Sequence, residues 1–157
     1  MVNGGHPVTI VVDVANVMGS RPDGWWRDRA GAAVRLHDQI ARLAAGGQAG
    51  FVMVLEGAAR AAAGRLVKAG RRAETGRRAE AGRRAETGPD GSGPVAPGEV
   101  RVVRARGSGD DAIVALVREL PGRRMVVTAD RELRERSMAA GAEIAGPGWL
   151  LGQLDRG

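Results

Sequence analysis

The fold is decided by the stretch Val8-Thr9-Ile10-Val11-Val12-Asp13, a run of mostly β-branched residues that ends in an acid. Runs that are apolar almost throughout suit strands buried on both faces, as in a parallel sheet. Three later runs share this form, and each leads to an acid: 51–55 to Glu56, 100–103 through a glycine-rich turn to Asp110-Asp111, and 125–128 to Asp130. Parallel strands end at one edge of their sheet, where ligands bind in open α/β folds. We therefore expect five carboxylates to converge there.

Carboxylates held this close repel one another and raise one another's pKa. Unless some of them are protonated or splayed apart, a hard divalent cation is the expected neutraliser. The sequence therefore predicts a Mg²⁺ or Mn²⁺ site with ligands from Asp13, Glu56, Asp110, Asp111 and Asp130.

Helical patterns alternate with these runs. Residues 14–26 are expected to form a turn and a loop, and apolar residues then recur at helical spacing over about 27–45 until Gly46-Gly47. Further helices are expected at 110–120, at 131–140 and near the carboxyl terminus, with a last edge strand at 142–145. The alternation predicts one α/β domain over residues 1–157, whose mostly parallel central sheet of about five strands is flanked by helices.

Residues 58–98 interrupt the alternation. Within them, residues 70–87 repeat a six-residue unit, Gly-Arg-Arg-Ala-Glu followed by Thr or Ala. A glycine at every sixth position matches no helical period, although 58–68 is compatible with a helix. We expect a solvated, mostly disordered, arginine-rich insertion, and the alternative is an arm that orders on RNA phosphates.

Composition narrows the function classes. The net charge is +6, half of it from the repeat, so charge by itself favours an anionic partner only weakly. The chain has no cysteine, which excludes disulfide partners and thiolate chemistry, and no run approaches the roughly 20 apolar residues of a membrane helix. We expect a cytoplasmic protein without a membrane partner, and a homo-oligomer is compatible with the sequence.

Each candidate residue has a structural interpretation beside the functional one. Asp13 and Asn16 suit a metal ligand and a phosphate-binding or orienting amide, or an ordinary turn. Asp110 and Asp130 suit ligands or N-caps, and Asp111 is the acid that capping leaves over. Arg131 suits a phosphate contact or a pair with Glu135.

The remaining candidates are aromatic side chains and histidines. Trp25 and Trp26 follow the first strand, where an indole can stack on a base or pack on a helix, whereas packing is favoured for Trp149. His6 and His37 are isolated and are not expected to bind metal. Phosphate-loop, nucleophile-elbow and His-Glu-x-x-His motifs are absent from the sequence.

At these residues the sequence resembles the NYN domains of the PIN-like nuclease superfamily, in particular its small bacterial branch. The likeness covers about residues 7–57 and 99–150. The family pattern Asp-x-x-Asn is matched by Asp13 to Asn16, its later acids by Glu56 and Asp110-Asp111, and its Thr-Ser-Asp-Arg by residues 128–131. Two positions depart from the family: Val14-Ala15 stand where a tyrosine is common, and Ala129 replaces a small hydroxyl residue. Both departures leave the acids intact.

The resemblance implies a PIN-like fold and a metal-dependent ribonuclease. In this hypothesis the acids bind Mg²⁺ or Mn²⁺, and Asn16 and Arg131 position phosphate. Two alternatives stay open: a non-catalytic RNA-binding or adaptor module, and a nucleoside triphosphate pyrophosphohydrolase that uses the same metal site.

Overall fold

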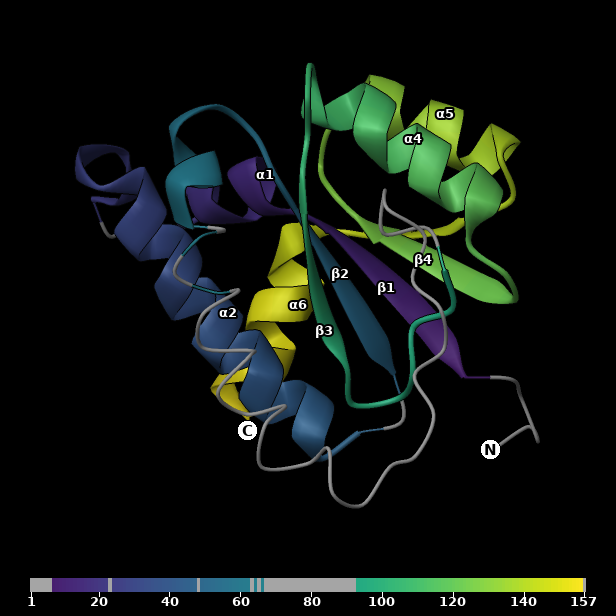
Figure 1. Ribbon diagram of the computed structural model, residues 1–157, viewed down its shortest axis with the longest axis horizontal. Helices are drawn as coiled ribbons and strands as arrows, with labels where there is room; N and C mark the ends of the chain where they lie inside the picture. Colours follow the sequence, from purple (N-terminus) through teal and green to yellow (C-terminus); the bar gives the residue numbers. More distant parts are fainter. Residues whose placement is uncertain are drawn as a thin grey trace.

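Five parallel strands form one sheet in the order β3-β2-β1-β4-β5 (Figure 1). The structure, a computed structural model, describes residues 7–22, 24–47, 49–62, 64, 66 and 93–156. The strands are β1 (Val8–Asp13), β2 (Gly50–Leu55), β3 (Val100–Arg104), β4 (Arg123–Val127) and β5 (Glu143–Ala145). The predicted single α/β domain with a five-stranded parallel sheet is therefore confirmed.

The central strand is β1, which pairs with β2 on one side and with β4 on the other. Its residues Val11 and Val12 are fully buried, as expected for a strand covered on both faces. The register places Asp13 opposite Val54 of β2 and Val12 opposite Val127 of β4. The first acid therefore stands at the end of the most enclosed strand.

Helices cover both faces of this sheet (Figure 1). One face packs against α1 (Val14–Gly19), α2 (Arg29–Ala45) and α6 (Pro147–Asp155), around Leu36, Ile40 and Leu150. The other face packs against α4 (Gly109–Glu119) and α5 (Arg131–Ala139), around Ile113, Val117 and Leu133. Two short 3-10 turns, η1 (Trp25–Arg27) and η2 (Gly57–Ala61), complete the described elements.

The strand order reverses direction at β1. The chain moves outward from β1 to β2 and β3, and then returns to place β4 on the opposite side of β1. The connections after β1 and β4 consequently leave toward opposite faces, with α1 on one face and α5 on the other. In doubly wound sheets this reversal is the preferred ligand site.

Two regions differ from the sequence-based expectation: residues 14–19, and the described ends of the predicted insertion. Residues 14–19 form helix α1 rather than a turn, because Asp13 caps the helix and Val14, Val17 and Met18 are buried. The start of the predicted insertion is packed, with Ala59, Ala62 and Leu66 in the core, while Val95 packs against the α4 face. Residues 67–92, which include the repeat 70–87, lie outside the described residues.

Trp149, for which a packing role was favoured, has 41% of its surface exposed. In the described part of the chain, no helix is both long and apolar enough to cross a membrane.

Candidate functional site

Asp13 is the buried acid of the site. Only 7% of its surface is exposed, and the carboxylate accepts hydrogen bonds from Thr128 Oγ1 at 3.0 Å and from the Asn16 backbone N–H at 3.4 Å. Burial raises the pKa of Asp13 to about 6, against the two hydrogen bonds, which lower it. The charges of Asp110 and Glu56 raise the pKa further, so these two acids lie within electrostatic reach of Asp13.

Thr128 joins β1 to β4 at the reversal of the sheet. Its fully buried hydroxyl donates to Asp13 Oδ2 and accepts the Asp130 amide N–H at 3.1 Å. We matched Thr128 to the family pattern but did not predict it as a site residue. The available signal was a hydroxyl at the end of an apolar run, where a buried polar group needs partners.

Asn16 makes a second link between the segments that follow β1 and β4. Its Oδ1 accepts the backbone N–H of Ala129 at 2.8 Å, so it fixes the loop between β4 and α5. The side-chain oxygen of Asn16 is therefore bonded to Ala129, and it is the Asn16 backbone N–H that reaches the Asp13 carboxylate.

Asp130 is the N-cap of α5. Its Oδ1 accepts the Leu133 N–H at 2.9 Å, and the residue is exposed. The structural interpretation is therefore satisfied, but the charge of Asp130 still faces the cluster because it raises the pKa of Asp110.

Glu56 connects the end of β2 to the start of α4. Its Oε2 accepts the Gly109 N–H at 2.6 Å, so the carboxylate lies on the helix N-terminus. A Cβ at Gly109 would lie 2.7 Å from the same oxygen, and therefore only glycine allows this approach without displacing Glu56.

Asp110 and Asp111 are neighbours with opposite environments. Partial burial raises the pKa of Asp110, and the charges of Asp130 and Glu56 raise it further. Asp111 instead accepts from Arg136 Nη2 at 2.9 Å, and this contact lowers the pKa of Asp111. The structure thus turns Asp110 toward the acids and engages Asp111 with α5.

The predicted substrate-binding residues other than Asn16 have partners of their own. Arg131 Nε lies 3.5 Å from Glu135 Oε1 and its side chain is 93% exposed, which matches the helical-pair interpretation. Trp25 packs against the core with the Arg29 guanidinium 5.4 Å from its ring centroid. Trp26 meets Trp25 edge to face and is 56% exposed.

The acids do not form a finished metal centre. Among the described residues, no three acidic or histidine side chains are placed to hold one ion together. The site is therefore a group of acids at the carboxyl edge of the sheet: Asp13 is influenced electrostatically by Asp110 and Glu56, and Asp110 by Asp130 and Glu56.

Comparison with known proteins agrees with this fold. The parallel sheet with acids at its carboxyl edge defines an open, doubly wound α/β domain. A solved structure that it resembles is that of Rae1 (YacP) from Bacillus subtilis, a tryptophan-to-leucine mutant, with a TM-score of 0.59 and 16% sequence identity. The match covers 96% of this chain and 76% of that one, and at this identity it shows the fold alone. No family model and no curated protein matches the sequence.

Proposed function

We propose that the protein is a metal-dependent ribonuclease that hydrolyses RNA phosphodiester bonds at the acidic carboxyl edge of the sheet, beside the ends of β1 and β4. The observation that carries the proposal is the position of Asp13, a buried acid at the reversal of a PIN-like sheet, whose pKa is raised by burial and by the facing charges of Asp110 and Glu56. Burying an acid among like charges costs stability, and acids whose pKa is shifted in this way are typical of functional sites.

The donors suit Mg²⁺ or Mn²⁺, which prefer carboxylate oxygen. Mg²⁺ commonly uses one or two carboxylates and completes its shell with water and substrate phosphate. A site of this type does not need three protein ligands in place before RNA arrives, which is compatible with the arrangement seen among the described acids. Asp13 and Asp110 would hold the ion, with Glu56 and Asp130 beside them.

The residues of the chain have separate tasks in this proposal. Thr128 holds the Asp13 carboxylate in one orientation, and Asn16 holds the loop that carries Asp130. Glu56 fixes the start of α4 and thereby Asp110. A bound ion would polarise a phosphoryl oxygen and lower the pKa of an attacking water. Without a cation, the acids would repel the phosphodiester.

The test is cleavage of end-labelled single-stranded RNA with Mg²⁺, Mn²⁺ or EDTA. We expect cleavage that requires metal and that Asp13→Asn lowers at least about 100-fold, because even partners outside a metal's ligand shell contribute 10- to 100-fold. The matched control is Asp38→Asn, an exposed aspartate on α2, which should leave the rate unchanged. Equal rates for the wild type and Asp13→Asn would overturn the proposal.

The same preparation separates the alternatives. RNA binding without turnover would indicate an adaptor module. Diphosphate or phosphate release from free nucleotides, with RNA left intact, would indicate nucleotide hydrolysis.

A further inference from the structure

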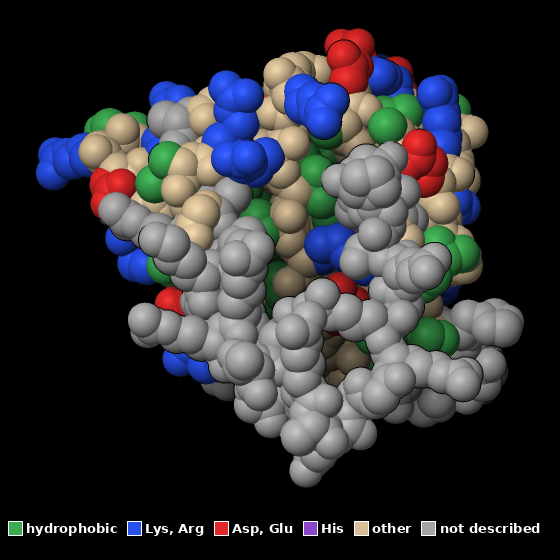
Figure 2. All heavy atoms as spheres, in the orientation of Figure 1, with side chains coloured by type: hydrophobic (Ala, Val, Ile, Leu, Met, Phe, Trp, Pro, Cys, Tyr) green, Lys and Arg blue, Asp and Glu red, His purple; other side chains and the backbone are tan. Residues whose placement is uncertain are grey.

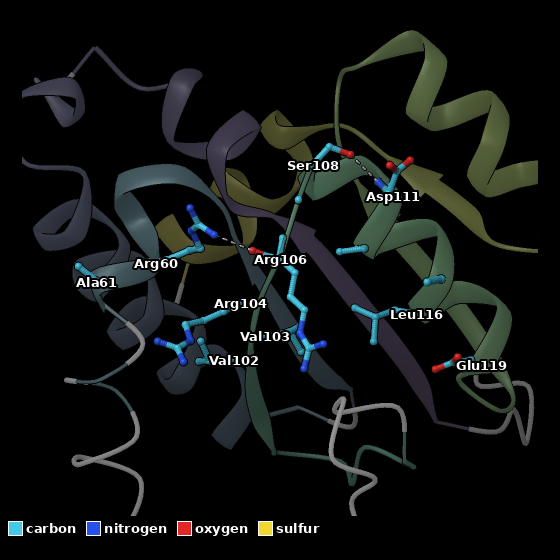
Figure 3. A pocket seen from close by; sticks show the side chains of 14 residues that line it. Arg60, Ala61, Val102, Val103, Arg104, Arg106, Ser108, Asp111, Leu116 and Glu119 are labelled. Atoms are coloured by element: carbon cyan, nitrogen blue, oxygen red, sulfur yellow. Dashed lines mark hydrogen bonds between the residues drawn. The ribbon is translucent and has the colours of Figure 1, made fainter.

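A groove of about 1140 Å³ runs along the outer edge of the sheet, between β3 and α4 (Figure 3). Its walls come from η2, from β3 and the turn after it, and from the side of α4 that faces them. Pockets for small ligands usually measure about 300–1,000 Å³. The size therefore suits a segment of a polymer better than a single nucleotide.

Three arginines line this groove. Arg60 comes from η2, Arg104 from the end of β3 and Arg106 from the turn toward α4, and all three are exposed. In Figure 3, Arg60 and Arg104 lie on one side of β3 and Arg106 on the other, facing α4. Figure 2 shows Lys and Arg side chains gathered over the upper part of this face, next to a hollow.

These guanidinium groups are available to an anion. Arg60 donates to the backbone carbonyls of Gly57 at 3.2 Å and Ala105 at 3.3 Å, which fixes its position without neutralising its charge. Over the part of the chain that the structure describes, Arg104 and Arg106 form no ion pair. Of the two acids in the lining, Asp111 is paired with Arg136, and Glu119 stands at the far end in Figure 3.

The floor of the groove is apolar. Leu116 is buried beneath it, and Val103, Ala112 and Ala115 complete the surface between the strand and the helix. A double helix stacks its bases inside and presents mainly backbone and groove edges to a protein, whereas a single strand leaves base faces free for apolar contact. An arginine rim above an apolar floor therefore favours a single strand.

The groove also leads to the acids. Ser108 lines its upper end, and the next residue, Gly109, donates its N–H to Glu56. Arg60 lies only four residues after Glu56, in the turn that follows β2. A strand in the groove would therefore pass close to the acids at the start of α4.

We propose that this groove binds the sugar-phosphate backbone of single-stranded RNA and delivers it to the acidic edge of the sheet. The inference rests on the proposed ribonuclease function for the identity of the polymer. Arg104 and Arg106 contact phosphates, and Arg60 supports the turn that carries them.

The test uses the full chain carrying Asp13→Asn, in EDTA, with a fluorescent single-stranded RNA of mixed sequence. Binding is measured over a range of salt concentrations. Adding Arg104→Ala with Arg106→Ala should weaken binding at least about tenfold, and should reduce the slope of log affinity against log salt by about 1.4, because each phosphate contact on a single strand contributes about 0.7.

The matched control is Arg42→Ala with Arg118→Ala, which removes the same charge from two exposed arginines outside the groove lining. This pair should leave the salt slope unchanged. Equal losses of RNA affinity in the two double variants would show that only the total charge matters, and would overturn the proposal that the groove binds RNA. A blunt RNA duplex should bind more weakly than the single strand, and tighter duplex binding would overturn the single-strand assignment.

Cleavage by the otherwise wild-type protein separates this inference from the proposed function. If the protein binds RNA through Arg104 and Arg106 and yet hydrolyses no RNA with either metal, RNA binding in the groove is supported and the proposed ribonuclease function is overturned. If the Arg104→Ala, Arg106→Ala variant binds RNA as the parent protein does and metal-dependent hydrolysis is normal, the RNA-binding role of the groove is overturned. The proposed ribonuclease function is then unaffected.

Discussion

The carboxyl edge of the sheet has two unlike halves. At β1 and β4, Asp13 is buried and held by Thr128 and Asn16, and other acids face it. At β3, Arg104 and Arg106 are exposed beside an apolar floor. Chemistry on a phosphodiester needs a few groups in fixed positions, whereas holding a flexible polymer needs accessible charge spread over a longer surface. This difference is the one expected if the acidic half carries out the proposed reaction and the arginine half binds the RNA.

The link between the halves is the contact of Glu56 with Gly109, which joins the end of β2 to the start of α4. Substitutions within one half and away from this contact should change either RNA cleavage or RNA binding and leave the other property unchanged.

The largest effect is expected for Asp13→Asn, which removes a charge from the acidic half. RNA cleavage with Mn²⁺ should fall at least about 100-fold, while the salt dependence of RNA binding in EDTA stays that of the wild type. Kinetics and binding on the same preparations measure both. A parallel loss of binding would show that the two halves are one surface.

The second effect is the pH dependence of stability. The pKa of Asp13 in the folded protein, about 6, lies above its ordinary value of 3.8, so the folded state holds the proton more tightly. Its contribution to stability is full below pH 3.8 and is lost as the pH rises through 6, with a total of about 3 kcal/mol at most. Urea unfolding in EDTA at pH 4.5 and 7.5 should show a fall in stability that Asp13→Asn reduces. An identical fall in the variant would contradict the assignment.

The third effect concerns the hydrogen bonds of the Thr128 hydroxyl, which connect the ends of β1 and β4. Thr128→Val keeps the shape of the side chain but removes the hydroxyl that donates to Asp13 and accepts from Asp130. We expect a loss of about 1–3 kcal/mol in the free energy of unfolding, together with a higher pKa for Asp13, because a buried acceptor and a backbone donor both lose a partner. Thr128→Ser is the control and should retain most of the stability. A valine variant as stable as the serine variant would mean that the hydroxyl is not needed.

The fourth effect tests the link between the halves. Gly109→Ala places a Cβ 2.7 Å from Glu56 Oε2, so the carboxylate must leave the Gly109 N–H. Activity should fall by roughly tenfold, while stability changes little because alanine is the better helix former by about 1 kcal/mol. Gly152→Ala in α6, whose Cβ would meet no atom within 4 Å, is the matched control for a glycine-to-alanine change in a helix. Indistinguishable activities of the two variants would remove Glu56 from the site.

The smallest effect is expected for Asp111→Asn. Asp111 is exposed and bound to Arg136, so its replacement should change cleavage by less than about threefold and leave the unfolding midpoint within error, as is usual for exposed ion pairs. Asp110→Asn, one residue earlier, should behave like Asp13→Asn. If Asp111→Asn lowers RNA cleavage as much as Asp110→Asn does, Asp111 must be counted among the metal ligands.

The sequence predicted the sheet and the existence of the acidic edge. Apolar runs that each lead to an acid and alternate with helical patterns require a parallel α/β arrangement, and parallel strands bring their ends to one edge. Helix α1 was missed, because the same residues Asp13 and Asn16 that signal a turn also suit a helix cap and its first turn.

Only the tertiary structure decided which acids face one another. Strand order is not written in any local pattern, and it was the place of β4 beside β1 that brought Thr128 to Asp13 across 115 residues of chain. Adjacent helical residues point about 100° apart, so the orientation of α4 separated Asp110 from Asp111. The arginine groove likewise comes from three segments whose side chains meet only after β3 takes the outer edge. Local periodicity specifies elements, but a site depends on distances between elements, and these are set by packing.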